Sequence, residues 1–230
     1  MGKIIVLEGL DGCGKGTQFE LLKGRLLEDK YKLKLLDFPQ YEDDSSIFVR
    51  RYLGGVYGND PNDINPYQAS LCYAMDRFDA FVQDKEIKEA IREEDRILLA
   101  NRYTTSNMLF QATKMEDDEK TIEFLNWLED IEYEKLGILR PDLVLFLYMP
   151  VEYSLKLMKG RDVNKNASKN NMKTDIHENN EDYLRMVAER SLLVAEKQGF
   201  KIINCVKDND IRTINDIHEE VYSLVKKMRN

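Results

Sequence analysis

The sequence has few of the residues on which several common protein classes depend. Its 230 residues include three cysteines, Cys13, Cys72 and Cys205, whose odd number and irregular spacing disfavour a disulfide framework or a cysteine metal site. We expect reduced thiols that pack as small apolar side chains. No apolar run approaches the roughly 20 residues that span a bilayer, and the first residues do not resemble a secretory signal. We therefore expect a cytoplasmic protein with no membrane contact.

Positive charge is also scarce. Asp and Glu outnumber Lys and Arg by 42 to 34, which gives a net charge of −8 at pH 7. The overall field of such a chain does not attract nucleic acid or anionic membranes, and we expect no nucleic-acid partner. Any phosphate site must therefore be built from a local group of residues.

What the chain does have is a regular alternation of short apolar runs and longer segments with helical period. This alternation predicts an α/β fold, a five-stranded parallel sheet flanked by helices, and the length fits a single domain over residues 1–230. The expected strands are 4–7, 33–36, 97–100, 143–147 and 201–204. The expected helices are 16–29, 67–92, 118–135, 151–160, 181–198 and 211–228.

One segment breaks the alternation. Residues 161–180, "RDVNKNASKNNMKTDIHENN", are polar, rich in Asn and Lys, and almost without apolar periodicity. Such composition predicts a mobile surface loop, with a solvated connection of no function as the alternative.

The stretch "LEGLDGCGKGTQ", residues 7–18, follows an apolar run and precedes a helical segment. Glycines at this spacing let successive backbone N–H groups face one anion, Lys15 adds a positive charge, and the helix directs its partially positive end at the same place. The loop and its context predict a nucleoside triphosphate site. Its expected contacts are Gly9, Gly12, Cys13, Gly14, Lys15, Gly16 and Thr17.

The residues that could support a metal ion depart from the usual phosphate-loop pattern. Gly16 stands where the common motif has a Ser or Thr that ligates Mg²⁺, and Thr17 comes one residue later. The Thr17 hydroxyl can reach Mg²⁺ through water, because this ion retains several waters. Glu8, at the end of the first expected strand, is a second candidate, with a buried pairing to Arg102 as the alternative.

Gly-Lys-Gly-Thr-Gln at residues 14–18 resembles the loop of adenylate kinases and their relatives. Further stretches resemble the thymidylate kinase family, bacterial type, within the P-loop nucleoside monophosphate kinases, and the match runs through most of the chain. The resemblance implies a three-layer P-loop kinase fold whose mobile lid covers about 161–180. The matching stretches are "DFPQY" (37–41), "SLCYAMDRFDAF" (70–81), "ANRYTTSNMLFQ" (100–111), "LRPDLVLFLYMPVEYSLKLMKGR" (139–161) and "DIHENNEDYLRMV" (175–187).

The activity that the resemblance implies is phosphorylation of dTMP to dTDP with ATP and Mg²⁺. Lys15, Arg102 and Asp11 are then the expected catalytic residues. Arg102 would clamp the acceptor phosphate, because its planar fork matches phosphate oxygens, and Asp11 would approach the 3′-hydroxyl of the sugar. Family members are usually homodimers, although the expected helices could also bury their apolar faces internally.

The resemblance also assigns an acceptor pocket. Tyr73 and Arg77 lie four residues apart on one helix face, which suits stacking on a pyrimidine and donation to a base carbonyl. Asn107 can both donate and accept, which fits the O4 and N3–H groups of thymine, and Phe110 would oppose a 2′-hydroxyl. The full expected dTMP set is Asp11, Phe38, Tyr73, Arg77, Arg102, Ser106, Asn107 and Phe110.

Three departures from the family pattern leave alternatives open. Asn101 stands at a position where the family has Asp. Gln40 and Tyr41 stand where the family has an arginine after the proline, and Ile176 stands where it has an arginine in the lid. Arg50 or Arg51 could replace the missing arginine beside the acceptor. Arg161, Lys165, Lys169 and Lys173 are the cations available in the lid, their spacing does not decide between them, and Arg161 is the expected contact to ATP. The open alternatives are a kinase for another deoxynucleotide or deoxynucleoside and a nucleotide-binding homologue with impaired catalysis.

Overall fold

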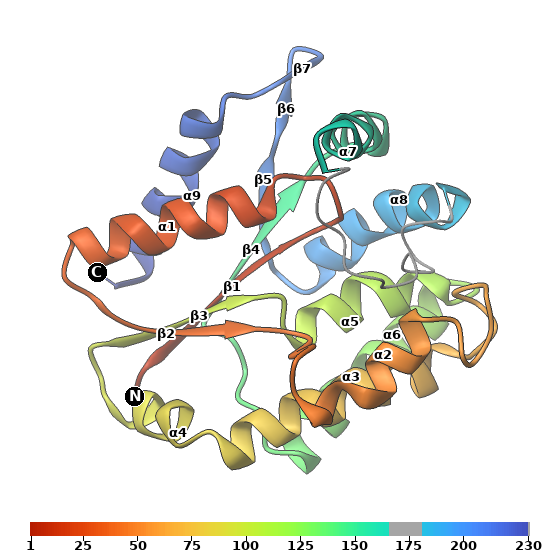
Figure 1. Ribbon diagram of the computed structural model, residues 1–230, viewed down its shortest axis with the longest axis horizontal. Coiled ribbons are helices and arrows are strands. Elements are labelled where there is room, and N and C mark those ends of the chain that lie inside the picture. Colours follow the sequence, from red (N-terminus) through yellow and green to blue (C-terminus); the bar gives the residue numbers. More distant parts are fainter. Residues whose placement is uncertain (166–180, 230) are drawn as a thin grey trace.

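The computed structural model describes residues 1–165 and 181–229, and a parallel sheet lies at its centre (Figure 1). The five strands are hydrogen-bonded in the order β2-β3-β1-β4-β5, and every adjacent pair is parallel. This confirms the predicted five-stranded parallel sheet. The strands are β1 (Lys3–Gly9), β2 (Lys32–Asp37), β3 (Arg96–Asn101), β4 (Leu143–Tyr148) and β5 (Lys201–Asn204).

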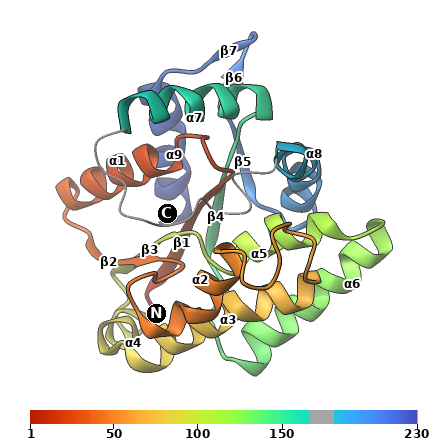
Figure 2. The same cartoon turned by 45° about the vertical axis from the view of Figure 1, so that its right-hand side comes forward.

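Helices cover both faces of the sheet, as Figures 1 and 2 show. Successive residues of β1 point to opposite faces: Ile5 and Leu7 pack with α1 and α9, whereas Ile4 and Val6 pack with residues of α3 and α4. An apolar run therefore forms a strand buried on both sides. The helices are α1 (Lys15–Glu28), α2 (Ile47–Leu53), α3 (Pro66–Gln83), α4 (Lys85–Arg92), α5 (Thr104–Gln111), α6 (Asp118–Glu129), α7 (Val151–Lys165), α8 (Glu181–Lys197) and α9 (Ile214–Arg229).

The predicted helix over 67–92 is wrong in one respect, because two helices occupy this range. Asp84 leaves the helical conformation, with ψ at 109°, and its carboxylate accepts hydrogen bonds from the N–H groups of Glu86 and Ile87. Its side chain thereby caps the start of α4. The predicted helix over 118–135 is α-helical only as far as Glu129, and the π-helical segment η3 (Asp130–Lys135) continues it.

Two other boundaries also differ from the prediction. Helix α7 continues to Lys165, so residues 161–165 are helical rather than loop, and residues 166–180 of the predicted lid lie outside the described residues. The hairpin of β6 (Val206–Lys207) and β7 (Asp210–Ile211) delays the start of α9 to Ile214. No helix in the described ranges is long and apolar enough to cross a bilayer.

Candidate active site

The glycine loop connects the buried strand β1 to helix α1. Gly12 and Gly14 have φ values of 82° and 86°, a conformation that favours glycine. A Cβ atom at Gly12 would also lie 2.7 Å from the backbone oxygen of Ser154 in α7. Among the described residues no side chain caps α1 at Gly14, so the first N–H groups of the helix are available to an anion.

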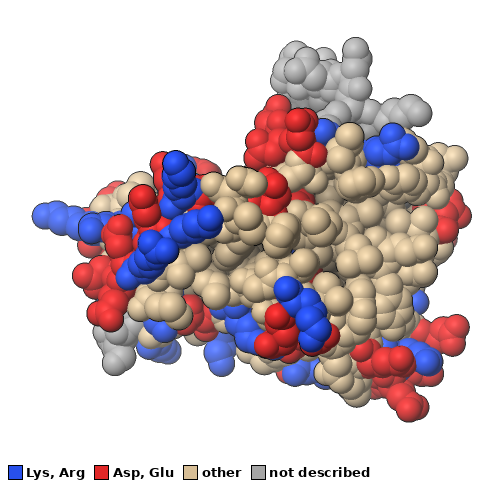
Figure 3. Space-filling model, turned by 90° about the horizontal axis from the view of Figure 1, so that it is seen from below, with Lys and Arg blue, Asp and Glu red and all other residues tan. Residues whose placement is uncertain are grey.

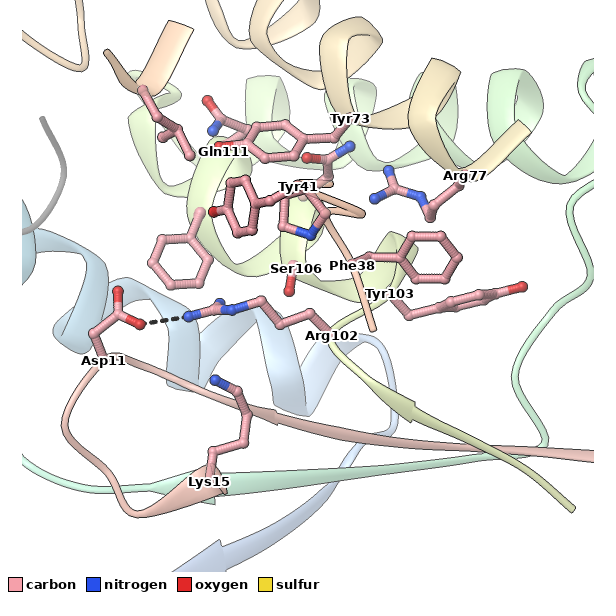
Figure 4. A pocket seen from close by; sticks show the side chains of 14 residues that line it. Asp11, Lys15, Phe38, Tyr41, Tyr73, Arg77, Arg102, Tyr103, Ser106 and Gln111 are labelled. Carbon is pink, nitrogen blue, oxygen red and sulfur yellow. Dashed lines mark hydrogen bonds and ion pairs between the residues drawn. The ribbon is translucent and has the colours of Figure 1, made fainter. Parts of the chain in front are cut away.

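Lys15 is the first residue of α1, and its ammonium group points from the loop toward Arg102 (Figure 4). Burial lowers the pKa of Lys15, and the positive charge of Arg102 lowers it further. A bound phosphate would offset both effects with negative charge. Gly16 and Thr17 follow on the exposed first turn of the helix.

Arg102 follows the last residue of β3 and has a positive φ of 63°. Its backbone N–H donates to the oxygen of Leu7, and its Nη2 lies 2.5 Å from Oδ1 of Asp11. Burial alone would lower the pKa of Arg102, but the charges of Asp11 and Glu8 raise it above its ordinary value. A permanently charged guanidinium is thus fixed between the glycine loop and the ring of Phe110, 5.1 Å away.

A pocket of about 270 Å³ lies beside this guanidinium. Each of the residues that the resemblance assigns to the acceptor lines it, and so does Lys15 (Figure 4). They come from the glycine loop, the segment after β2, α3 and the segment that continues from β3 into α5. The lining residues that sequence reasoning missed are Pro39, Tyr41, Leu53, Tyr103 and Gln111.

Most of these missed residues had a signal in the sequence. Tyr41 lies in "DFPQY" and Gln111 in "ANRYTTSNMLFQ", stretches already assigned to the pocket by resemblance. Asp76 anchors the first stretch, because its carboxylate accepts hydrogen bonds from the N–H of Gln40 and the hydroxyl of Ser45. The loop after β2 is therefore fixed to α3 over the pocket.

Arg77 and Asn107 meet at the floor of the pocket, where both contact a residue that sequence reasoning did not find. Glu132 is fully buried and accepts hydrogen bonds from Nε of Arg77 at 2.7 Å and from Nδ2 of Asn107 at 3.0 Å. Burial alone would lower the pKa of Arg77, but the charge of Glu132 raises it. The three side chains form a buried, charge-assisted network.

Glu8 has a different role from the metal contact suggested for it. Its side chain is fully buried and accepts hydrogen bonds from the N–H of Tyr103 and the hydroxyls of Thr105 and Ser106, at 3.1, 2.6 and 2.9 Å. These donors lie at or just before the start of α5, where a carboxylate is favoured by the helix dipole. Glu8 therefore joins β1 to the pocket helix.

Another acid, Asp37, lies at the end of β2, beside Asn101 of β3. Asn101 pairs with Asp37 in the register of β3 and β2, and its Nδ2 donates to Oδ1 of Asp37 at 2.9 Å. Burial raises the pKa of Asp37, while the hydrogen bond from Asn101 and the charge of Lys15 oppose the rise. Position 101 itself carries no carboxylate, but the carboxylate of Asp37 lies beside it on the neighbouring strand.

The suggested substitutes for the missing arginine lie outside the pocket. Nη1 of Arg50 donates to the backbone oxygens of Tyr41 and Asp43, at 2.6 and 2.7 Å, and Nε of Arg51 donates to the hydroxyl of Tyr57. Arg50 stabilises the loop after β2 instead of facing a ligand. Arg161 falls within α7, and Ile176 lies outside the described residues.

Comparison with known proteins assigns the chain to a family. The family model described as thymidylate kinase matches residues 7–215. The chain belongs to the thymidylate kinase family. A probable thymidylate kinase of Thermococcus gammatolerans is 31% identical over 229 residues, covering 99% of this chain and 97% of that protein. A thymidylate kinase of Thermoanaerobacter is 26% identical over 227 residues and covers 98% of each chain.

Solved structures show the same fold. The thymidylate kinase of Candida albicans matches with a TM-score of 0.66 and 18% identity, over 99% of this chain and 92% of that one. The expected P-loop kinase architecture is thereby confirmed. The activity of the family is phosphoryl transfer, and the pocket described above is lined both by residues of the glycine loop and by Arg102.

Proposed function

We propose that the protein transfers the γ-phosphoryl group of ATP to dTMP, giving dTDP and ADP. One observation supports this beyond family membership: Lys15 of the glycine loop and Arg102 line the same pocket as the aromatic and amide residues of α3 and α5. A donor phosphate on the loop and an acceptor phosphate at Arg102 would then face each other. Phosphoryl transfer needs such positioning and charge stabilisation more than covalent chemistry.

The donor side consists of the glycine loop and the start of α1. Lys15 would neutralise the terminal phosphates of ATP, and the backbone N–H groups of the loop would bind their oxygens. The fixed Arg102 would draw the acceptor phosphate in line with the donor. We assign donor binding to Gly9, Gly12, Cys13, Gly14, Lys15, Gly16 and Thr17, with Arg161 as a proposed contact from α7.

The acceptor side consists of the pocket walls. Tyr73 would stack on the thymine ring, Arg77 and Asn107 would bind its polar edge, and Phe110 would crowd the sugar where a ribonucleotide carries its 2′-hydroxyl. Asp11 would serve twice, because it pairs with Arg102 and lines the pocket near the expected sugar. Phe38 and Ser106 complete the proposed dTMP site.

We infer that Mg²⁺ accompanies ATP. Within residues 1–165 and 181–229, no three His, Cys, Asp or Glu side chains form a metal cage. The oxygen donors available beside the loop are the hydroxyl of Thr17, the carboxylate of Asp37 and the buried Oδ1 of Asn101, which has no hydrogen-bond partner among the described residues. This set fits Mg²⁺ held by phosphate oxygens and water. The ion would neutralise charge on the donor phosphates.

Comparing acceptors tests the proposed function. With ATP and Mg²⁺, we expect dTMP to give ADP and dTDP, dUMP to be a weaker substrate because it lacks the thymine methyl group, and thymidine to be inactive because Arg102 has no phosphate to bind. The measurement is ADP release, with product identity from chromatography. Faster turnover of thymidine than of dTMP would indicate a deoxynucleoside kinase, and dTMP binding without ADP formation would indicate a homologue with impaired catalysis.

We further infer that two copies of the chain associate. Figure 3 shows a face whose middle carries few charged side chains, and α3 exposes Leu71, Met75 and Val82 by about two-fifths of their surface. These residues recur at helical spacing and form an apolar stripe. A second copy is the occupant that the family resemblance supports.

A further inference from the structure

Glu132 lies behind the pocket lining and contacts both side chains that face the base edge. It belongs to η3, the π-helical continuation of α6, and its side chain is fully buried. Its Oε2 accepts from Nε of Arg77, and its Oε1 accepts from Nη2 of Arg77 at 2.5 Å and from Nδ2 of Asn107 at 3.0 Å. One carboxylate therefore fixes the orientation of two neighbouring side chains.

The contacts of Asn107 determine which end of its amide faces the pocket. Its Nδ2 donates to Oε1 of Glu132 and also to the backbone oxygen of Ser70 at 3.2 Å, which uses both of its N–H bonds. A flipped amide would place its oxygen against a carboxylate and a carbonyl, two groups that only accept. Asn107 therefore offers a ligand its oxygen.

Arg77 offers the opposite chemistry. A guanidinium has only donors, and the bidentate pair with Glu132 fixes its fork while it lines the pocket from α3 (Figure 4). The pocket floor thus presents a donor from Arg77 beside an acceptor from Asn107. A base that fits must therefore present an acceptor to Arg77 and, next to it, a donor to Asn107.

We propose that Glu132 is a positioning residue that fixes this donor and acceptor order and so selects a thymine edge against a cytosine edge. Thymine presents the O4 acceptor beside the N3–H donor, whereas cytosine presents a 4-amino donor beside the N3 acceptor. With cytosine, a donor would face the donor of Arg77 and an acceptor would face the acceptor of Asn107. The inference rests on the proposed function, because it identifies how the dTMP site discriminates between pyrimidines.

The test compares dTMP with 5-methyl-dCMP, which keeps the methyl group and reverses the polar edge. We expect the wild-type protein to favour dTMP by at least about 1000-fold in kcat/KM. In Glu132→Gln, an amide replaces the carboxylate and lets Asn107 turn. We expect this ratio to fall at least about 10-fold and the KM for dTMP to rise at least about 10-fold, while the KM for ATP stays within about 2-fold.

Two further variants separate positioning from stability. Glu134→Gln is the matched control, because Glu134 lies two residues away on the surface and pairs only with Arg140 among the described residues; we expect the wild-type ratio. The double variant Arg77→Gln/Glu132→Gln removes both buried charges together, so it leaves no lone charge to unfold the protein. We expect the double variant to discriminate between dTMP and 5-methyl-dCMP as poorly as Glu132→Gln does.

The outcomes distinguish this inference from the proposed function. If the wild-type protein does not phosphorylate dTMP, the proposed function fails. If it does, and Glu132→Gln keeps the wild-type ratio of kcat/KM for dTMP over 5-methyl-dCMP, Glu132 has only a structural role and the inference is overturned. Calorimetry on the wild-type protein adds a direct check: N3-methyl-dTMP should bind at least about 100-fold more weakly than dTMP, and equal binding would contradict the assigned order.

Discussion

Replacing Lys15 with alanine is expected to lower kcat for phosphoryl transfer to dTMP by at least about 1000-fold. The ammonium is buried beside Arg102, in a position where burial already lowers its pKa, so little water screens its interaction with a phosphate. Alanine removes the positive charge and leaves the loop backbone in place. The measurement is initial rate of ADP formation at saturating ATP and dTMP.

Lys23→Ala is the matched control for this prediction. Lys23 lies on the same helix, α1, but forms a surface pair with Glu20, and such pairs contribute little. We expect its kcat to stay within about 2-fold of wild type. A Lys15→Ala variant with nearly normal kcat would show that the donor phosphates do not lie on the glycine loop.

Replacing Arg102 with glutamine is expected to lower kcat/KM for dTMP by about 1000-fold or more. Arg102 is held by Asp11 in the pocket, and its fork is the group placed to bind the acceptor phosphate as charge develops. Glutamine is shorter and uncharged but, like arginine, carries a Cβ atom, so it adds no new strain at the positive φ of this position. The measurement is steady-state kinetics with dTMP as the varied substrate.

Arg96→Gln is the matched control for this prediction. Arg96 lies at the opposite end of β3 and pairs with Glu93, so we expect nearly normal kinetics and at most a small loss of stability. If Arg102→Gln changed the KM for ATP and left kinetics toward dTMP intact, the guanidinium would belong to the donor site and the proposed geometry would be wrong.

The sheet and the glycine loop could be predicted because their signals are local. An apolar run in a parallel sheet is buried on both faces, and the loop needs glycine where φ is positive, as at Gly12 and Gly14. The division of the helix over 67–92 was missed because it depends on one side chain. Asp84 can continue a helix or cap the next one, and the choice is made by its hydrogen bonds to α4.

The pocket could be predicted only where sequence stretches carried the family resemblance. Tyr73, Arg77 and Asn107 lie in such stretches, whereas Glu132 is separated from Arg77 by 55 positions and meets it only through the packing of η3 under the pocket. Asp37 likewise reaches Asn101 only through the pairing of β2 with β3. Pairwise spacing in the chain holds no information about either contact.

Arg50 illustrates the converse error. Its charge and its place after the loop suggested a phosphate contact, but in the fold its guanidinium binds backbone oxygens of that loop. A solvated or structural arginine and a ligand-binding arginine look alike in a sequence. Only the direction of the side chain separates them, and that direction is set by tertiary packing.

A crystal structure with dTMP and a non-hydrolysable ATP analogue tests the central claim most directly. We expect the thymine N3 and O4 atoms within about 3.2 Å of Asn107 Oδ1 and an Arg77 nitrogen, the dTMP phosphate on Arg102, and the analogue's phosphates on Lys15 and the glycine loop. Binding of dTMP outside this pocket, or phosphates of the analogue away from the loop, would contradict the account.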